Sequence, residues 1–263
     1  MRSGEAKMKV VILAGGLPST IAEDKQGVPK PMVEIGENPI LWHIMKGYGA
    51  HGFHEFIICA GYRKEMIKDY FNDFYIYQSD ITVDLRNNTI EIHKNITEDW
   101  KVTVVDTGQY SSTGQRISQI QKYIDGETFI VNFGDCLSNI DVNKLIEAHH
   151  EKQKWATVAL AHPAGRNQIL DIDEEGNYLG VRKPDAADNQ AWVNAGVYVF
   201  NRQVFHYLLG NYQLEKQLLE TLAEKQQVST YQHKGFWSPI ETKRDKEQME
   251  NLWNAGIAPW KIW

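Results

Sequence analysis

The segment Lys9-Val-Val-Ile-Leu-Ala-Gly-Gly16 decides the fold class of this chain of 263 residues. Its continuous apolar run, rich in β-branched residues, is typical of a strand buried on both faces of a parallel sheet. The two glycines predict a tight loop at the carboxyl end of that strand. A second strand of this kind is expected at residues 55–60, and residues 39–49 between the two carry apolar side chains at helical spacing. This order predicts a parallel α/β unit.

The same alternation continues along the chain. A third buried strand is predicted at residues 129–133, and helices at residues 64–74 and 141–153, the second of them capped by Asp141 or Asn139. Further strands are expected at residues 156–161, 169–172, 178–181 and 193–200, and further helices at residues 214–226 and 246–255. The fold class that follows is α/β, with a mixed, mostly parallel sheet flanked by helices. Such sheets bind ligands at the carboxyl ends of their strands.

One stretch, residues 76–106, departs from this rhythm. It alternates apolar and polar residues, and its Asn87-Asn88 pair is a hairpin turn signal. We therefore expect an antiparallel insertion there. The chain has no low-complexity linker and no internal repeat, so we interpret residues 8–263 as a single domain with a C-terminal sub-region at 201–263, and residues 1–7 as an extension.

The chain carries 28 Lys and Arg against 34 Asp and Glu, a formal net charge of −6. Proteins held by nucleic-acid phosphates or by anionic membranes normally have a basic excess, so we expect neither partner. No stretch approaches the roughly 18 apolar residues of a membrane helix. The cysteines, Cys59 and Cys136, lack the spacing of a zinc site or a disulfide framework, which favours a cytoplasmic protein. An anionic ligand must therefore be met by a few local cations.

Three local patterns point to phosphate chemistry. Glycines such as Gly15 and Gly16 after a strand let backbone N–H groups approach phosphate oxygens, and the same pattern also fits a plain tight turn. Lys30 lies between two prolines, so its ammonium is held in a stiff segment and loses little entropy when it pairs with a phosphate. Asp135 follows a buried strand at a glycine, where a carboxylate either reaches a metal in the cleft or caps the next turn.

These patterns belong to a larger set of motifs. The set comprises Leu13-Ala-Gly-Gly16, Pro29-Lys-Pro-Met-Val-Glu-Ile-Gly36, Pro39-Ile-Leu-Trp-His-Ile-Met45, Asp106-Thr-Gly108, Gly134-Asp135, Val193-Asn194, Gly235-Phe-Trp237 and Ala258-Pro-Trp-Lys261. In these motifs the chain resembles the sugar-phosphate nucleotidyltransferases, and the likeness runs from residue 8 to residue 263 without large gaps. The Gly-Phe-Trp motif and the Ala-Pro-Trp-Lys tail resemble the cytidylyltransferase branch of that family.

The resemblance implies a Rossmann-like nucleotidyltransferase fold and an enzyme that transfers CMP from CTP to a sugar 1-phosphate, with release of pyrophosphate. It implies Mg²⁺ as the cofactor, held by Asp135 and Glu241, and a catalytic set of Lys30, Asp135 and Lys183. It assigns the nucleotide to Leu13, Ala14, Gly15, Gly16, Lys30, Thr113, Gly114 and Arg116, and the sugar phosphate to Arg182, Lys183 and Asn194. It also implies a homo-oligomer, with residues 76–106 and the Trp-rich C-terminal end as candidate contacts.

The chain departs from the family pattern within these motifs. The glycine loop continues as Pro18-Ser-Thr-Ile21 where the family has Gly-Thr-Arg, and Val28 replaces a lysine. Arg182 stands where a glutamate usually receives a sugar hydroxyl, and Glu241 is longer than the usual aspartate. Arg182 predicts an acidic or phosphorylated acceptor rather than plain glucose 1-phosphate. The alternative function is a homologue that binds a nucleotide or a sugar nucleotide without turnover, whereas a Rossmann dehydrogenase lacks support because the first loop has no third glycine.

Overall fold

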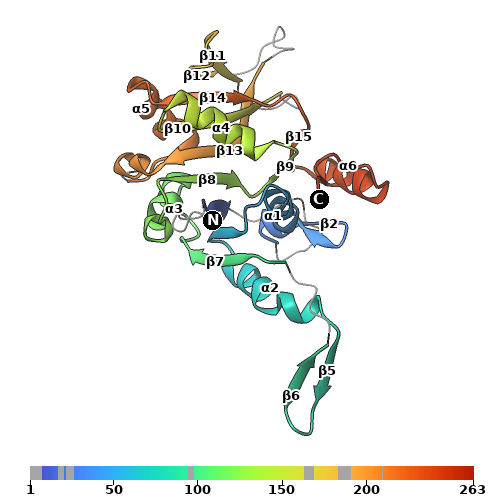
Figure 1. Ribbon diagram of the computed structural model, residues 1–263. Helices are drawn as coiled ribbons and strands as arrows, with labels where there is room; N and C mark the ends of the chain where they lie inside the picture. The colour runs from blue at the N-terminus through green and yellow to red at the C-terminus, as the bar shows by residue number, and fades with distance from the viewer. Residues whose placement is uncertain are drawn as a thin grey trace, which may run out of the picture.

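The computed structural model describes residues 8–16, 21, 27–93, 98–162, 169–182, 191–208 and 210–263. Its centre is a seven-stranded sheet (Figure 1). In spatial order the strands are β14 (Val228–Gln232), β10 (Ala156–Ala161), β13 (Val193–Asn201), β8 (Thr128–Phe133), β1 (Val10–Ala14), β4 (Glu55–Ala60) and β7 (Lys101–Asp106). The three strands predicted as buried apolar runs, β1, β4 and β8, are neighbours in this sheet.

The direction of the strands brings the predicted loops together. β8, β1, β4 and β7 pair in parallel, as do β10 and β14, whereas β13 runs antiparallel to both of its neighbours. The prediction of a mixed, mostly parallel sheet is confirmed. The loops that follow Ala14, Ala60, Asp106 and Phe133 therefore meet at one edge of the sheet, which is where ligands bind in this class of fold.

Helices cover both faces of the sheet because its strands are apolar on both sides. Along β1, Val10 and Ile12 belong to one buried cluster and Val11 belongs to the other. The first cluster takes residues from α1 (Ile40–Ala50), α2 (Lys64–Tyr77), α4 (Val142–Lys152) and α6 (Lys243–Asn254). The second takes residues from α3 (Thr113–Gln119), α5 (Leu219–Glu224), the 3-10 helix η3 (Arg202–Tyr207) and the π-helix η4 (Leu214–Leu218).

Short elements surround the sheet. The 3-10 helices η1 (Lys30–Met32) and η2 (Gln121–Tyr123) lie in connections. The antiparallel pairs are β2 (Glu34–Ile35) with β3 (Asn38–Pro39), β11 (Ile169–Ile172) with β12 (Tyr178–Arg182), and β9 (Cys136–Ser138) with β15 (Trp237–Pro239). Asp141 caps α4 by accepting a hydrogen bond from the backbone N–H of Lys144, as one of the two predicted alternatives requires. The predicted extension at residues 1–7 lies outside the described residues, and the division into one domain with a C-terminal sub-region stays a prediction.

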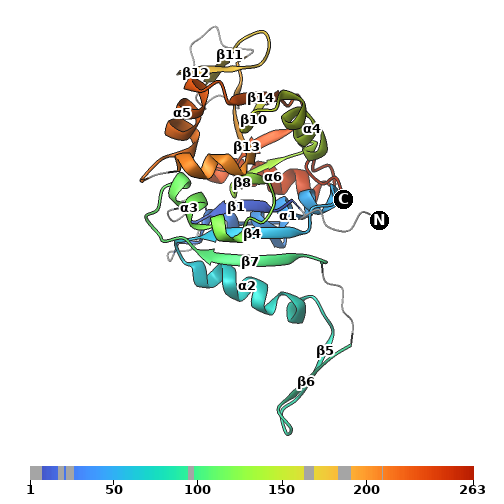
Figure 2. The ribbon, with the colours of Figure 1, turned by 60° about the vertical axis from the view of Figure 1, so that its left-hand side comes forward.

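The insertion predicted at residues 76–106 is confirmed only in part. β5 (Ile81–Asp84) and β6 (Thr89–Ile92) form an antiparallel hairpin that projects from the body of the protein (Figure 1, Figure 2). The prediction was wrong for residues 101–106, which form β7 and pair in parallel with β4 at the edge of the main sheet. An edge strand is covered less fully than a central one, so its sequence can alternate like that of an antiparallel strand.

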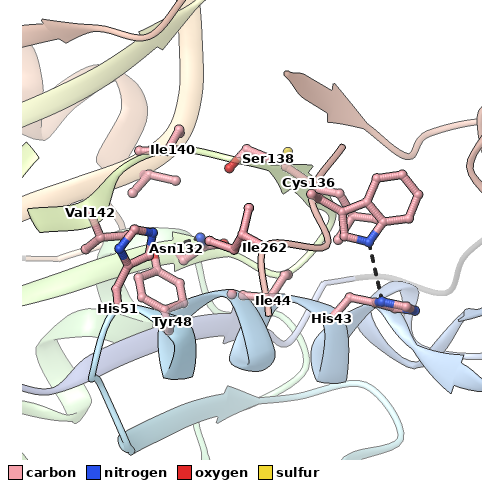
Figure 3. A pocket seen from close by; sticks show the side chains of 14 residues that line it. His43, Ile44, Tyr48, His51, Asn132, Cys136, Ser138, Ile140, Val142 and Ile262 are labelled. Carbon is pink, nitrogen blue, oxygen red and sulfur yellow. Dashed lines mark hydrogen bonds between the residues drawn. The ribbon is translucent and has the colours of Figure 1, made fainter. Parts of the chain in front are cut away.

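The Trp-rich C-terminal end, a candidate for contacts between subunits, packs on this chain's own helix α1. Trp260 is buried, and its indole N–H donates a hydrogen bond of 3.4 Å to Nδ1 of His43, drawn as a dashed line in Figure 3. Nε2 of His43 bonds the carbonyl oxygen of Ile35 at 2.9 Å. Ile262 closes a cavity of about 30 Å³ that lies beside this pair (Figure 3). A neutral imidazole therefore joins the C-terminal end to the core.

We predict that His43 makes the fold less stable in acid. Burial lowers the pKa of His43 from 6.5 to about 4, although backbone hydrogen bonds to Ile35 and Asn38 raise it. Between these two values the unfolded chain binds a proton at His43 and the folded chain does not. The free energy of unfolding therefore falls as the pH falls through this window, by up to about 3 kcal/mol.

Urea unfolding of the wild type and of His43→Gln, measured near neutrality and below about pH 5, tests this expectation. The variant lacks the neutral imidazole that accepts the hydrogen bond from Trp260. We therefore expect it to be less stable than the wild type near neutrality. It is also expected to lose less stability on acidification than the wild type. Equal losses in the two proteins would contradict the assignment to His43.

Candidate active site

A cleft of about 710 Å³ opens at the edge of the sheet where β1 and β8 end. The predicted nucleotide-binding residues that line it are Leu13, Gly15, Gly16, Lys30, Thr113 and Arg116. The other two, Ala14 and Gly114, are buried. The strand-end rule thus brings together residues that lie far apart in the sequence.

A second cavity of about 330 Å³ adjoins the cleft. The two spaces share Phe133, Asp135, Glu215 and Glu241 in their linings, and Asn194 lines the second cavity alone. The side chain of Arg182 and the whole of Lys183 lie outside the described residues. The arrangement offers room for two ligands that meet at Asp135 and Glu241.

Lys30 and Asp135 form an ion pair in the cleft. Nζ of Lys30 donates to Oδ2 of Asp135 over 3.0 Å, and both side chains are about two-thirds buried, with 30% exposed. Lys30 begins η1 and has a proline on either side, Pro29 and Pro31, which restricts its backbone. The backbone just before Asp135 is also closely packed, because a Cβ on Gly134 would lie 2.8 Å from the carbonyl oxygen of Leu13. Each partner is therefore held by a rigid piece of backbone.

Glu241 is placed beside Asp135 by the pairing of β15 with β9. Pro239 lies opposite Cys136, and the backbone N–H of Ile240 donates to the carbonyl oxygen of Asp135 over 2.9 Å. Burial alone would lower the pKa of Lys30, but the nearby carboxylates of Asp135 and Glu241 outweigh burial and raise it. Lys30 therefore remains an ammonium group at neutral pH.

Asp135 and Glu241 are the groups that fit a divalent cation. Mg²⁺ is commonly held by one or two carboxylates together with substrate phosphates and water, rather than by a full cage of side chains. The described residues contain no cluster of three or more Asp, Glu, His or Cys side chains that would make such a cage. Two carboxylates at the junction of the two cavities match the incomplete set that Mg²⁺ uses with phosphates.

Arg116 is a buried brace behind the glycine loop. Its guanidinium donates to the carbonyl oxygens of Gly15 at 2.6 Å and Gly108 at 2.8 Å, and to Oγ1 of Thr107 at 2.8 Å. A further bond of 3.2 Å reaches the carbonyl oxygen of Gln109. Burial lowers the pKa of Arg116, against the raising effect of nearby groups, and arginine stays protonated in proteins in any case. Its donors are directed to protein oxygens, so Arg116 holds the backbone of the glycine loop at Gly15.

The start of α3 forms the far wall of the cleft. Ser112 and Gln115 make a capping box, in which the Ser112 hydroxyl accepts from the N–H of Gln115 and the Gln115 side chain accepts from the N–H of Ser112. Oγ1 of Thr113 donates to Oε2 of Glu215 over 2.7 Å. Glu215 was missed by the sequence analysis. The Ser-x-x-Gln spacing was a signal for α3, whereas no local pattern marks Glu215 as a cleft residue.

Comparison with known proteins identifies related chains. Residues 9–250 match the family model described as "Nucleotidyl transferase". The chain is 41% identical over 258 residues to a glucose-1-phosphate cytidylyltransferase of Salmonella typhi, covering 97% of this chain and 100% of that protein. It is 35% identical over 260 residues to a probable glucose-1-phosphate cytidylyltransferase of Bacillus subtilis, with the same coverage. Among solved structures, a UDP-glucose pyrophosphorylase in complex with UDP-glucose has the same fold, with a TM-score of 0.73 at 20% identity, over 95% of this chain and 100% of that one.

We predict that the glycine at position 15 is required by Arg116. A Cβ at Gly15 would lie 1.9 Å from Nη1 of Arg116, so Gly15→Ala forces the guanidinium out of its bonds. Such overpacking costs roughly 1–3 kcal/mol of unfolding free energy. Gly16→Ala is the matched control, because a Cβ there meets nothing within 4 Å. Urea denaturation of both variants is the measurement, and equal stability of the two would contradict the brace.

Proposed function

The chain belongs to the nucleotidyl transferase family, and on that premise we propose that it transfers CMP from CTP to a sugar 1-phosphate. The acceptor is glucose 1-phosphate or a related phosphorylated sugar, and the products are a CDP-sugar and pyrophosphate. The observation that carries the proposal is the position of Asp135 and Glu241 at the junction of two adjoining cavities, with Lys30 paired to Asp135 in the larger one. A nucleotide in one cavity and a sugar phosphate in the other would have their phosphates at this junction.

The reaction is an in-line displacement at phosphorus. An oxygen of the sugar 1-phosphate forms a bond to the α-phosphorus of CTP, and the bond from that phosphorus to the oxygen bridging the β-phosphate breaks. The electron pair leaves with pyrophosphate. Catalysis of such transfers rests on positioning and on neutralising the charge of the phosphate oxygens. The proposal gives Lys30 the second task, because its ammonium lies in the cleft beside Asp135.

Arg116, which the resemblance assigns to the nucleotide, acts instead through the glycine loop, because its donors bond protein oxygens. Gly15 and Gly16 offer backbone N–H groups to the triphosphate, and the start of α3 faces the base. We assign Mg²⁺ to Asp135 and Glu241, where it would supply positive charge to the reacting phosphates. The sugar phosphate is assigned to Asn194, Arg182 and Lys183.

An assay of pyrophosphate release tests the function. Purified protein with Mg²⁺ is given each of the four common nucleoside triphosphates with a panel of sugar 1-phosphates. We expect CTP to be required. An acidic or further phosphorylated sugar 1-phosphate as the fastest acceptor would support the prediction from Arg182, and glucose 1-phosphate as the fastest acceptor would rule that prediction out. Binding of CTP by calorimetry without pyrophosphate release across the panel would overturn the proposal in favour of a homologue without turnover.

We predict that Lys30→Met reduces kcat/KM by about 100-fold or more, the usual cost of removing one group that stabilises transition-state charge. Lys68→Met is the matched control, because Lys68 is an exposed lysine on α2 that lines neither cavity, and it should leave the rate unchanged. Initial rates and thermal unfolding of both variants are measured. A Lys30→Met protein that folds normally and keeps the wild-type rate would exclude the assigned role.

We also propose that the chain forms a homo-oligomer through the β5–β6 hairpin. Ile81 pairs with Ile92 and Val83 pairs with Ile90, so these four aliphatic side chains share one face of the hairpin. Each is between 38% and 56% exposed in the single chain. A two-stranded hairpin is marginally stable alone in water, and an uncovered aliphatic face favours association. A second copy of this chain, presenting the same hairpin, is the proposed cover.

A charge on the aliphatic face of the hairpin should weaken this assembly. We expect Ile90→Lys to lower the molar mass measured by sedimentation equilibrium. Thr89→Lys, which lies on the opposite, polar face, serves as the control and should keep the wild-type mass. An Ile90→Lys protein with an unchanged mass above that of the single chain would rule this contact out.

The expectations that the chain has no membrane partner and that it lies in the cytoplasm remain predictions. Among the described residues, no helix is long and apolar enough to cross a membrane. Cys59 and Cys136 are free thiols.

A further inference from the structure

The second cavity contains a carboxylate to which the motifs assign no role. Glu215 lines both cavities. It belongs to the π-helix η4, which lies far along the chain from β8, the strand that ends just before Asp135. A π-turn is rare and often marks a functional site. We propose that the carboxylate of Glu215 accepts hydrogen bonds from hydroxyl groups of the acceptor sugar and so contributes to the choice of acceptor. This inference rests on the proposed function.

The backbone around Glu215 is anchored to the start of α3. The backbone N–H of Gly114 donates to the carbonyl oxygen of Tyr212 over 3.0 Å, and the N–H of Leu214 donates to Oγ1 of Thr113 over 2.8 Å. A Cβ on Gly114 would lie 2.6 Å from the carbonyl oxygen of Tyr212, so the two segments are in close contact. Glu215 is therefore presented to the cavity from a fixed position.

One oxygen of the Glu215 carboxylate is already oriented. Oγ1 of Thr113 accepts from Leu214, so its own hydrogen is available to point to Oε2 of Glu215, 2.7 Å away. For Oε1, the described residues supply no hydrogen-bond donor, and none of the described Lys, Arg or His side chains forms an ion pair with this carboxylate. The side chain thus faces the cavity with one oxygen held and the other open to a ligand.

The chemistry of the cavity lining favours Glu215 for this role. The charged side chains among the described lining residues are Asp135, Glu215 and Glu241, and the first and last of these stand at the proposed metal. Asn194 is largely engaged, because its Oδ1 accepts from the N–H of Gly196 at 2.8 Å and its Nδ2 donates to the hydroxyl of Tyr198. The indole N–H of Trp237 donates to the carbonyl oxygen of Ala195.

A sugar brings several hydroxyl donors that need acceptors once they leave water. The other described side chains of the lining are mostly apolar, including Leu170, Val181 and Val193, and suit the carbon face of a sugar ring. Among the described lining residues, Glu215 is the strong acceptor with no other assignment. The charge of Glu215 also contributes to the raised pKa of Tyr198, after the larger effect of burial.

Kinetics of Glu215→Gln test the proposal. Gln keeps the size and can still accept from Thr113, but it presents an amide in place of the open carboxylate oxygen. A hydrogen bond to a charged group corresponds to roughly 10- to 100-fold in affinity, so the KM for the sugar 1-phosphate should rise by about that factor. The KM for CTP and the Mg²⁺ concentration for half-maximal rate should stay at the wild-type values. Glu220→Gln, an exposed glutamate on α5, is the control and should change none of them.

Deoxy analogues of the accepted sugar 1-phosphate identify the hydroxyl. The wild type should lose activity with one analogue, and Glu215→Gln should be nearly indifferent to the same deletion. The proposal is overturned if the variant keeps the wild-type KM for the sugar, if it discriminates among the analogues as the wild type does, or if the change falls on CTP or Mg²⁺ instead. The same assay distinguishes failure of this inference from failure of the proposed function. Absence of turnover by the wild type would overturn the proposed function. Normal turnover by Glu215→Gln with unchanged kinetic constants would overturn only the role of Glu215.

Discussion

The buried guanidinium of Arg116 is the interaction on which the site depends. A planar group with five donors can bond several oxygens at once, and here it joins the end of β1 at Gly15 to the loop that follows β7. The space it fills excludes side chains on two sides, since a Cβ at Gly61 would also lie 2.7 Å from Nη1 of Arg116. Gly15, which the sequence analysis assigns to ligand approach, is thus required first by an internal cation, whereas Gly16 is not. Arg116 therefore fixes the backbone at Gly15 and Gly61 without a ligand.

Much of this arrangement was predictable, and the reasons are local. The apolar runs at β1, β4 and β8 could be read directly, and the rule that parallel strands end at one edge predicted one cleft for Gly15 and Asp135. Lys30 was assigned to the site by its flanking prolines and by the family resemblance. Edge position misled the interpretation of β7, because an incompletely covered parallel strand has the pattern of an antiparallel one.

What the sequence could not yield are contacts that depend on tertiary packing. Thr113 and Glu215 are separated by 102 positions along the chain, and the turn that aims Glu215 is a π-helix, which has no readable period in a short segment. Arg116 was identified as a site residue through the family resemblance, but its bonds to carbonyl oxygens follow only from the fold. The identity of the site residues was therefore more predictable than the hydrogen bonds that they make.

The charges that line the two cavities limit how a triphosphate can be bound. Among the described residues, the carboxylates of Asp135, Glu215 and Glu241 face only two cations, Lys30 and Arg116. Arg116 is committed to backbone oxygens and Lys30 to Asp135. Lys30 can turn to a phosphate only if Asp135 gains another positive partner, since an unpaired half-buried carboxylate beside a polyanion is strongly disfavoured. The same pair that holds the site together without ligand therefore makes nucleotide binding depend on a cation supplied with it.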